Sequence, residues 1–320
     1  MDPYNPASFN HRLEKLSTGK TYHFIDQLPK DGLTPTTPTI LCCHGFPDLW
    51  YGWRHQIAPW NHAGYRVVVP DMLGYGETDQ PKDAVEYSTK NLCADLAALL
   101  DLIGVKQSVI IGHDWGAATV WRFALYYPSR VKALVTLSIP YVPPAPVYIS
   151  PPEMAQRIPN FGYQVYFGDE RSTTEIESKL ETFLSLMYRF PGTGKSFAKL
   201  GQLQSTLANA DELQYYLVQY RNGGMLGPLS YYRTNKVRFE EERDHKLQSE
   251  VSPSFPVLFV WGTADPTCST KHVESMRKFV KNLTEVKLDG LGHWLMVEGK
   301  DVLADHVLNF LASSGVKAKL

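Results

Sequence analysis

The sequence predicts an α/β protein with a mostly parallel, twisted sheet, helices on both faces of the sheet and an inserted helical cap. Short apolar runs alternate with longer stretches that carry apolar residues at helical spacing. Strands that are apolar throughout are typical of parallel sheets, because crossover helices cover both of their faces. A proline-dense break and a helix-patterned segment interrupt this alternation before it resumes.

The order of the expected elements follows from local patterns along the chain. An amino-terminal hairpin spans residues 12–25, with Ser17-Thr18-Gly19 as its turn. Beyond it, apolar runs predict strands, and apolar residues at helical spacing predict helices. We expect strands at 39–43, 66–69, 108–111, 133–137, 256–261 and 284–288, and core helices at 89–103, 117–127 and 302–311.

The alternation of strands and helices is broken after residue 138. The stretch 139–152 is dense in proline, which can continue neither a helix nor a central strand, so we expect a linker there. Helix-patterned segments follow until the strand pattern resumes. We therefore expect a core in two parts, residues 1–139 and 250–320, with residues 140–249 forming a helical cap, or lid.

Helices are expected at two places in this cap. Ser172 to Glu175 fits a capping box, and apolar residues at helical spacing continue from it to Met187. Residues 211–221 place leucines and tyrosines on one helical face, and Gly223-Gly224 is a helix-ending signal.

Composition limits the partners of this chain. Its 320 residues are 43% hydrophobic, and 32 basic and 33 acidic residues leave a net charge of -1. This balance gives no electrostatic reason to expect nucleic acid or an anionic membrane as a partner. No apolar run is long enough to span a bilayer, and the first residues lack the pattern of a secretion signal. We expect a monomer or homodimer that acts on a small molecule.

The cysteines indicate a reducing compartment. The spacing of Cys42, Cys43, Cys93 and Cys268 fits neither a metal site nor a disulfide framework. Buried, reduced thiols in a cytoplasmic protein are the simplest interpretation. The carboxyl-terminal Ala318-Lys319-Leu320 resembles the peroxisomal signal Ser-Lys-Leu with alanine for serine, so a peroxisomal location is the alternative.

Asp114 is the most informative residue of the chain. It lies at the centre of Gly112-His113-Asp114-Trp115-Gly116, between a predicted strand and a predicted helix. This arrangement is a nucleophile elbow, in which small residues permit a tight turn and a close approach of the substrate. Enzymes that cleave esters and amides usually place serine at the centre, so a carboxylate there restricts the chemistry.

A carboxylate nucleophile favours displacement at a saturated carbon. A serine that attacked such a carbon would form an ether, which water and a histidine base cannot break. An aspartate forms an alkyl ester, and water can then attack the carbonyl carbon of the aspartate and release an alcohol. The leaving group is a halide or the oxygen of a strained epoxide.

An acid and a histidine follow the elbow, each just beyond a predicted strand. Asp265 follows the strand 256–261, and His293 follows the last strand. The order nucleophile, acid, histidine is that of the α/β-hydrolase triad, and residues at the carboxyl ends of parallel strands gather at one edge. We expect Asp265 to orient His293, and His293 to activate water. The alternative is that Asp265 is an exposed turn residue before Pro266. The other position that commonly carries the acid, directly after the strand 133–137, holds Ser138 instead, so Asp265 keeps the role.

The loop after the strand 39–43 is expected to complete the site. It reads His44-Gly45-Phe46-Pro47, and its position suits an oxyanion hole. The expected donors are the backbone N–H groups of Phe46 and Trp115, directed at the carbonyl oxygen of Asp114 during attack by water. A cis peptide bond before Pro47 fits such a loop.

Together these motifs resemble the epoxide hydrolases of the α/β-hydrolase superfamily. The resemblance rests on the loop His44-Gly45-Phe46-Pro47, the elbow around Asp114, Asp265 and Gly292-His293-Trp294, and it covers about residues 11–310. It implies the α/β-hydrolase fold and hydrolysis of epoxides to vicinal diols without a cofactor or a metal. Because the chain starts at the hydrolase domain, it looks more like the single-domain soluble forms, and lipid epoxides would suit a peroxisomal enzyme.

The resemblance also implies two lid tyrosines. The segment 159–167 looks like the first lid-tyrosine motif, with Tyr163 in the catalytic position, and 228–233 looks like the second, with Tyr232. Epoxide opening develops an alkoxide, and a phenol with a pKa of about 10 can donate to it without being ionised at neutral pH. The neighbours Tyr166 and Tyr231 are the alternatives. We expect the substrate to contact Phe46, Trp115, Phe161, Gln164 and Phe167, for each of which core packing is the alternative role.

Two other functions are left open. A haloalkane or haloacid dehalogenase would also use an aspartate nucleophile, and the indole of Trp115 could hold its halide, but it needs no paired tyrosines. A non-catalytic, ligand-binding homologue would lack a catalytic residue, and none is missing here.

Overall fold

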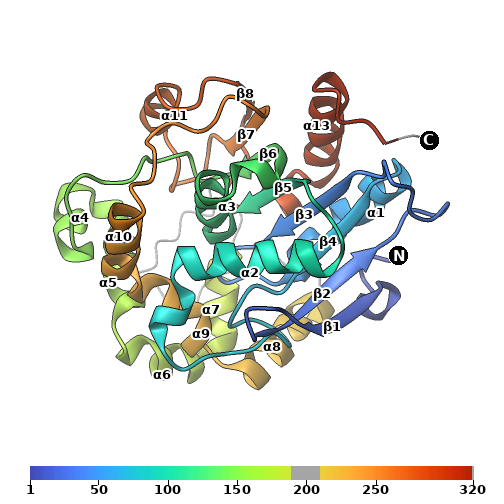
Figure 1. The fold of residues 1–320 in the computed structure, drawn as a ribbon. Helices are drawn as coiled ribbons and strands as arrows, with labels where there is room; N and C mark the ends of the chain where they lie inside the picture. Colours follow the sequence, from blue (N-terminus) through green and yellow to red (C-terminus); the bar gives the residue numbers. More distant parts are fainter. Residues whose placement is uncertain (189–209, 319–320) are drawn as a thin grey trace.

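A mixed sheet forms the centre of the protein. The computed structural model describes residues 1–188 and 210–318. The sheet has eight strands in the order β1-β2-β4-β3-β5-β6-β7-β8 (Figure 1). All neighbours from β4 to β8 pair in parallel, whereas β1 and β2 form an antiparallel edge. The predicted α/β class with a mostly parallel sheet is therefore confirmed.

The strands lie where the apolar runs predicted them, with ends that differ by a few residues at most. The parallel strands from β3 to β7 are buried along almost their whole length. Their bounds are β1 (His11–Lys15), β2 (Thr21–Gln27), β3 (Thr39–Cys43), β4 (Arg66–Pro70), β5 (Ser108–His113), β6 (Val131–Leu137), β7 (Val257–Gly262) and β8 (Leu283–Leu288).

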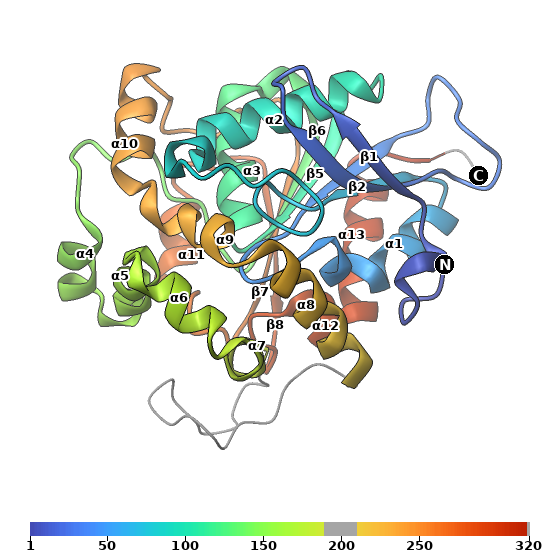
Figure 2. The same cartoon turned by 90° about the horizontal axis from the view of Figure 1, so that it is seen from below.

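Two groups of helices cover the core sheet, one group on each face. α2 packs against α3, and α1 packs against α13 in the other group (Figures 1 and 2). Ser88 caps α2 by accepting a hydrogen bond from the Asn91 N–H. The bounds are α1 (Arg54–His62), α2 (Thr89–Leu102), α3 (Trp115–Tyr126), α11 (Thr270–Met276), α12 (Leu295–Glu298) and α13 (Lys300–Ser313).

A set of helices, called the insertion below, lies between β6 and β7 in the sequence. In Figure 1 these helices lie at the left and the bottom of the core, whereas α13 lies at the upper right. The insertion comprises α4 (Pro151–Arg157), α5 (Gly162–Gly168), α6 (Arg171–Glu177), α7 (Leu180–Met187), α8 (Ala210–Gly223), α9 (Leu226–Ser230) and α10 (Asn235–Asp244).

The expected capping box at Ser172 is wrong. Ser172 lies inside α6, and its hydroxyl donates to the carbonyl oxygens of Phe167 and Asp169. The expected continuous helix is also interrupted, because α6 ends at Glu177 and α7 begins at Leu180. Burial of Leu180 and Leu184 explains the apolar spacing without one straight helix.

The proline-dense linker is shorter than expected. A capping box forms at Ser150 and Glu153, and Pro151 and Pro152 occupy the first turn of α4. Proline is tolerated there because the first N–H groups of a helix have no intrahelical partner.

The described residues include the four cysteines but only part of the terminal tripeptide. All four cysteines lie there, and they are buried thiols outside any disulfide. Among the described helices, none combines the length and the apolar character needed to cross a membrane. Of the terminal tripeptide, Lys319 and Leu320 lie outside the described residues.

Candidate active site

The sharp turn at Asp114 has the geometry of a nucleophile elbow. β5 ends at His113 and α3 begins at Trp115, which leaves Asp114 between them with φ 51° and ψ -119°. A positive φ is costly for a residue with a side chain, and such strain is found at functional sites. A Cβ on Gly116 would lie 2.1 Å from the carbonyl oxygen of Cys43, so the turn requires glycine there. The structure thus has a sharp strand-to-helix turn at the position where the sequence predicted the elbow.

The loop after β3 binds one oxygen of the Asp114 carboxylate. The Phe46 N–H donates to Oδ1 of Asp114 at 2.8 Å, and the Phe46–Pro47 peptide bond is cis, as expected. In the described chain, the Trp115 N–H makes no hydrogen bond with this carboxylate. Oδ1 is therefore held by a backbone donor, and Oδ2 is the oxygen left for other partners.

His293 lies between two carboxylates. Its Nδ1 is 2.9 Å from Oδ2 of Asp265, and its Nε2 is 3.6 Å from Oδ2 of Asp114. Oδ1 of Asp265 accepts from the N–H and the hydroxyl of Thr267 at 2.8 and 2.7 Å. Asp265 is only 3% exposed, so it is a buried, fully bonded acid and not an exposed turn residue.

The backbone around His293 is held by residues that the motifs did not reveal. The carbonyl oxygen of His293 accepts from Nε2 of His113 at 2.8 Å and from the Ser138 hydroxyl at 3.0 Å. Glu298 accepts from the backbone N–H groups on either side of His293, those of Gly292 and Trp294. Burial, followed by the charge of His293, lowers the pKa of His113 to about 3, so His113 is a neutral donor.

The site electrostatics favour a protonated histidine. Burial alone would lower the pKa of His293, but Asp265 and Asp114 outweigh it and raise the pKa to about 10. Burial would also raise the pKa of both carboxyls, and the imidazole partner reverses this, so the pKa of each lies below its usual value. The free site therefore holds an imidazolium between two carboxylates at neutral pH.

Tyr163 and Tyr232 lie together near this charged group. Their ring centroids are 6.3 Å apart, one on α5 and the other just after α9. Burial, followed by the nearby Asp114 charge, raises the pKa of Tyr163 to about 12 and that of Tyr232 well above its usual value. Both phenols therefore remain protonated at neutral pH, which a hydrogen-bond donor requires.

The alternative tyrosines occupy other positions. The Tyr231 hydroxyl donates to the carbonyl oxygen of Leu73 at 2.9 Å, so it serves as a structural contact. Tyr166 is 41% exposed. The geometry thus separates Tyr163 and Tyr232 from their sequence neighbours.

The expected pocket residues lie around the two tyrosines to different degrees. Phe46 and Phe167 each contact the ring of Tyr232, at 5.2 and 5.1 Å, and Trp115 meets the same ring edge-on at 5.0 Å. Gln164 donates to the Tyr163 hydroxyl at 3.5 Å, and Phe161 reaches only the Tyr163 ring, at 6.5 Å.

Arg238 of α10 was not expected at the site. Its guanidinium carbon lies 4.8 Å from the ring centroid of Trp115, a cation–π geometry. Burial lowers the pKa of Arg238 to about 10, so it remains cationic at neutral pH. No sequence motif pointed to this contact, because it joins α10 to the elbow across the insertion.

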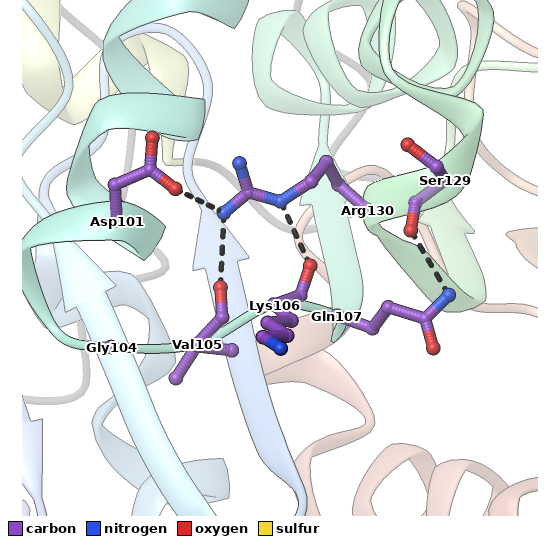
Figure 3. Close-up of a pocket in the computed structure, with 7 residues that line it drawn as sticks. All are labelled: Asp101, Gly104, Val105, Lys106, Gln107, Ser129 and Arg130. Carbon is purple, nitrogen blue, oxygen red and sulfur yellow. Dashed lines mark hydrogen bonds and ion pairs between the residues drawn. The ribbon is translucent and has the colours of Figure 1, made fainter.

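A surface hollow shown in Figure 3 is separate from this site. It lies beside the start of β5 and β6, at the edge opposite to Asp114, and several of its polar groups pair with one another. Arg130 donates to the carbonyl oxygens of Val105 and Lys106 and pairs with Asp101 at 2.8 Å. Within residues 1–188 and 210–318, no group of three or more His, Cys, Asp or Glu side chains is arranged to hold a metal ion.

Known proteins share this fold. The family described as the alpha/beta hydrolase fold matches residues 38–300. Among solved structures, epoxide hydrolase A of Mycobacterium thermoresistibile has a TM-score of 0.83 at 29% identity, covering 95% of this chain and 98% of that one. An epoxide hydrolase from Vigna radiata also reaches 0.83, at 26% identity over 96% and 99%. The fold thus defines an α/β hydrolase.

Curated relatives narrow this class further. Epoxide hydrolase srdG of Neurospora crassa is 31% identical over 97% of both chains, and epoxide hydrolase A of Mycobacterium tuberculosis is 33% identical over 87% of this chain and 91% of its own. The mouse bifunctional epoxide hydrolase 2 is 31% identical, and this chain spans about half, 54%, of its length. The chain belongs to the epoxide hydrolases of the α/β-hydrolase fold family.

Proposed function

We propose that this chain hydrolyses epoxides to vicinal diols through a covalent ester on Asp114. The observation that carries the proposal is the orientation of the Asp114 carboxylate. Oδ1 is bound by the Phe46 N–H, while Oδ2 lies near His293. The family membership and the pair of protonated tyrosines near Asp114 support the same reaction.

In the first step, Oδ2 of Asp114 attacks an epoxide carbon. A carbon–oxygen bond forms to Asp114, the epoxide carbon–oxygen bond breaks, and the ring oxygen takes a proton from Tyr163 or Tyr232. The products are an alkyl ester, a β-hydroxyl group and a tyrosinate. The high pKa of both phenols makes them weak acids, and they therefore release a proton only to the strongly basic alkoxide.

Ester formation changes the charge around His293. The negative charge of Asp114 disappears, and with it one of the two carboxylates that raise the pKa of the imidazole to about 10. The imidazolium can then return a proton to the tyrosinate and become a neutral base. Asp265 still holds Nδ1 at 2.9 Å, which leaves Nε2 to face the water.

In the second step, His293 takes a proton from water, and the oxygen of that water attacks Cγ of Asp114. The negative charge gathers on Oδ1, where the N–H groups of Phe46 and Trp115 are the proposed donors. Collapse breaks the ester bond, and the departing diol oxygen takes the proton from His293. The new carboxyl group, which carries one oxygen from water, returns its proton to His293.

We propose that residues 140–249 act as the cap in this reaction. Its helices carry both tyrosines, while the core strands carry Asp114, Asp265 and His293. The aromatic rings around the tyrosines, those of Phe46, Phe167 and Trp115, favour epoxides with apolar substituents.

The test is a comparison of two substrate classes. We expect diol from styrene oxide and from an epoxidised fatty acid, and no halide release from 1-chlorobutane. An Asp114→Ala variant should form no diol. Halide release without diol would indicate a dehalogenase, and tight binding without product would indicate a non-catalytic homologue.

A further inference from the structure

We propose that Asp48, Tyr188 and Tyr216 form a clamp that positions the Phe46 N–H for hydrolysis of the alkyl ester. The clamp joins the insertion to the loop that supplies this oxyanion donor. The inference rests on the proposed function, because it concerns the second step of that reaction. Its members touch no reacting atom, so they are positioning residues.

A backbone hydrogen bond closes the loop that carries the Phe46 N–H. The Asp48 N–H donates to the carbonyl oxygen of Gly45 at 3.0 Å, which folds Phe46 and Pro47 into a tight turn. Oδ1 of Asp48 also accepts from the N–H of Leu49 at 2.8 Å. The direction of the Phe46 N–H therefore depends on where Pro47 and Asp48 are held.

Tyrosines of the insertion hold those two residues. The Tyr188 hydroxyl donates to the carbonyl oxygen of Pro47 at 2.6 Å, and the Tyr216 hydroxyl donates to Oδ1 of Asp48 at 2.6 Å. The Tyr220 hydroxyl adds a longer bond to the Asp48 carbonyl oxygen at 3.1 Å. Three phenols thus bind the backbone and side chain directly after the oxyanion donor.

The Asp48 carboxyl has almost no room to move. It is 1% exposed, and a Cβ on Gly52 would lie 2.0 Å from its Oδ2. Burial raises the pKa of Asp48, with His44 and the Tyr216 bond acting in the opposite direction. Burial of a carboxyl is costly unless hydrogen bonds offset it, and the bonds to Asp48 come from the insertion and from the loop that carries Phe46.

Tyr188 also reaches the loop of the catalytic base. Its ring stacks on Trp294 with centroids 4.4 Å apart and an interplanar angle of 27°. The indole N–H of Trp294 donates to the carbonyl oxygen of Met187 at 2.7 Å. Since Trp294 follows His293 directly, the end of α7 contacts both loops that must cooperate in the second step.

Such a clamp would affect the two chemical steps differently. During alkylation, negative charge leaves the Asp114 carboxylate, so the bond from the Phe46 N–H weakens and its loss does not slow this step. During hydrolysis, a full charge develops on Oδ1, and the same bond strengthens in the transition state. A misaligned Phe46 N–H should therefore slow hydrolysis alone.

General anchoring of the insertion does not depend on the clamp. α8 is also attached through the buried ion pair of Arg54 with Glu212 at 2.6 Å and through the bond from the Trp50 indole to the Tyr215 hydroxyl. Removing one clamp hydroxyl should therefore leave α8 in place. The variants Tyr188→Phe and Tyr216→Phe keep the rings and delete only these hydroxyls.

The experiment is a single turnover of trans-stilbene oxide with excess enzyme, quenched with acid. Mass spectrometry of the Asp114 peptide follows formation and decay of the ester. The matched control is Tyr65→Phe, which removes the hydroxyl of another buried tyrosine, one that bonds the carbonyl oxygen of Val316 at 2.7 Å, far from the site. Thermal unfolding verifies that all three variants lose a similar, small amount of stability.

We expect ester formation within about twofold of wild type and ester decay at least about tenfold slower in both clamp variants, since a lost oxyanion donor costs about 100-fold or more. Tyr65→Phe should match wild type in both steps. Decay rates within about twofold of wild type, or equal slowing of both steps, would overturn the clamp while leaving the proposed function intact. Wild-type enzyme that forms no ester would instead remove the proposed function, and this inference with it.

Discussion

Nε2 of His293 lies 3.6 Å from Oδ2 of Asp114, too far for a tight hydrogen bond and close enough for strong charge pairing. The same imidazole binds Asp265 at 2.9 Å through Nδ1. His293 is thus fixed by the acid and only loosely engaged with the proposed nucleophile. This arrangement leaves Oδ2 free to attack while it keeps the base beside the future ester.

Replacement of His293 by Gln should separate the two steps. Asp114 keeps its Phe46 N–H bond, so the ester should still form, but no base remains to activate water. We expect the Asp114 peptide to accumulate the mass of one substrate while diol formation stops. His62→Gln, an exposed histidine at the end of α1, is the control and should turn over normally.

The stability of the protein should depend on pH through His293. Its pKa is raised from an ordinary 6.5 to about 10 in the folded state, although burial opposes the two carboxylates. A raised pKa means that this stabilisation is complete below about pH 6.5 and is lost as the pH rises toward about 10. The free energy of unfolding of wild type relative to His293→Gln, measured by urea denaturation, should therefore decrease from pH 7 to pH 10. A constant difference would contradict a charged His293.

The two tyrosines should act on the first step. Tyr163→Phe and Tyr232→Phe each remove one donor to the epoxide oxygen, and we expect ester formation to slow about 10- to 100-fold in each and further in the double variant. Tyr166→Phe, its exposed neighbour, is the control for the first. Stopped-flow tryptophan fluorescence measures this step, and unchanged rates in the double variant would reject the tyrosines as donors.

Asp265 should matter chiefly through His293. Asp265→Asn removes the charge that holds Nδ1 protonated, so the pKa of His293 should fall and ester hydrolysis should slow by about 100-fold or more. The pH dependence of the ester decay rate tests this claim. An Asp265→Asn enzyme with the same pH profile as wild type would contradict it.

Much of the fold and the charged site could be predicted because the signals are local. Each strand of the core is a short apolar run, and Asp114, Asp265 and His293 lie just beyond the ends of such runs. Parallel strands bring these ends to one edge, so separation in sequence does not matter. The α1 helix was not predicted because its buried face includes Arg54, Gln56 and Asn61, polar side chains of the kind usually found on the surface.

Other features depend on contacts that no local pattern encodes. Only the resemblance could single out Tyr163 and Tyr232. Their neighbours Tyr166 and Tyr231 are also tyrosines, and the local sequence does not distinguish them. The bonds from Tyr188 to Pro47 and from Tyr216 to Asp48 join residues 141 and 168 positions apart. Such pairs form only when the insertion packs on the core.

The central claim is that Asp114 forms a covalent ester, and a single turnover in heavy-oxygen water with excess enzyme tests it most directly. We predict a diol without the label and one labelled oxygen in the Asp114 peptide, because water attacks the carbonyl carbon of the ester. A labelled diol with unlabelled Asp114 would mean that water attacks the epoxide itself, and it would contradict the account.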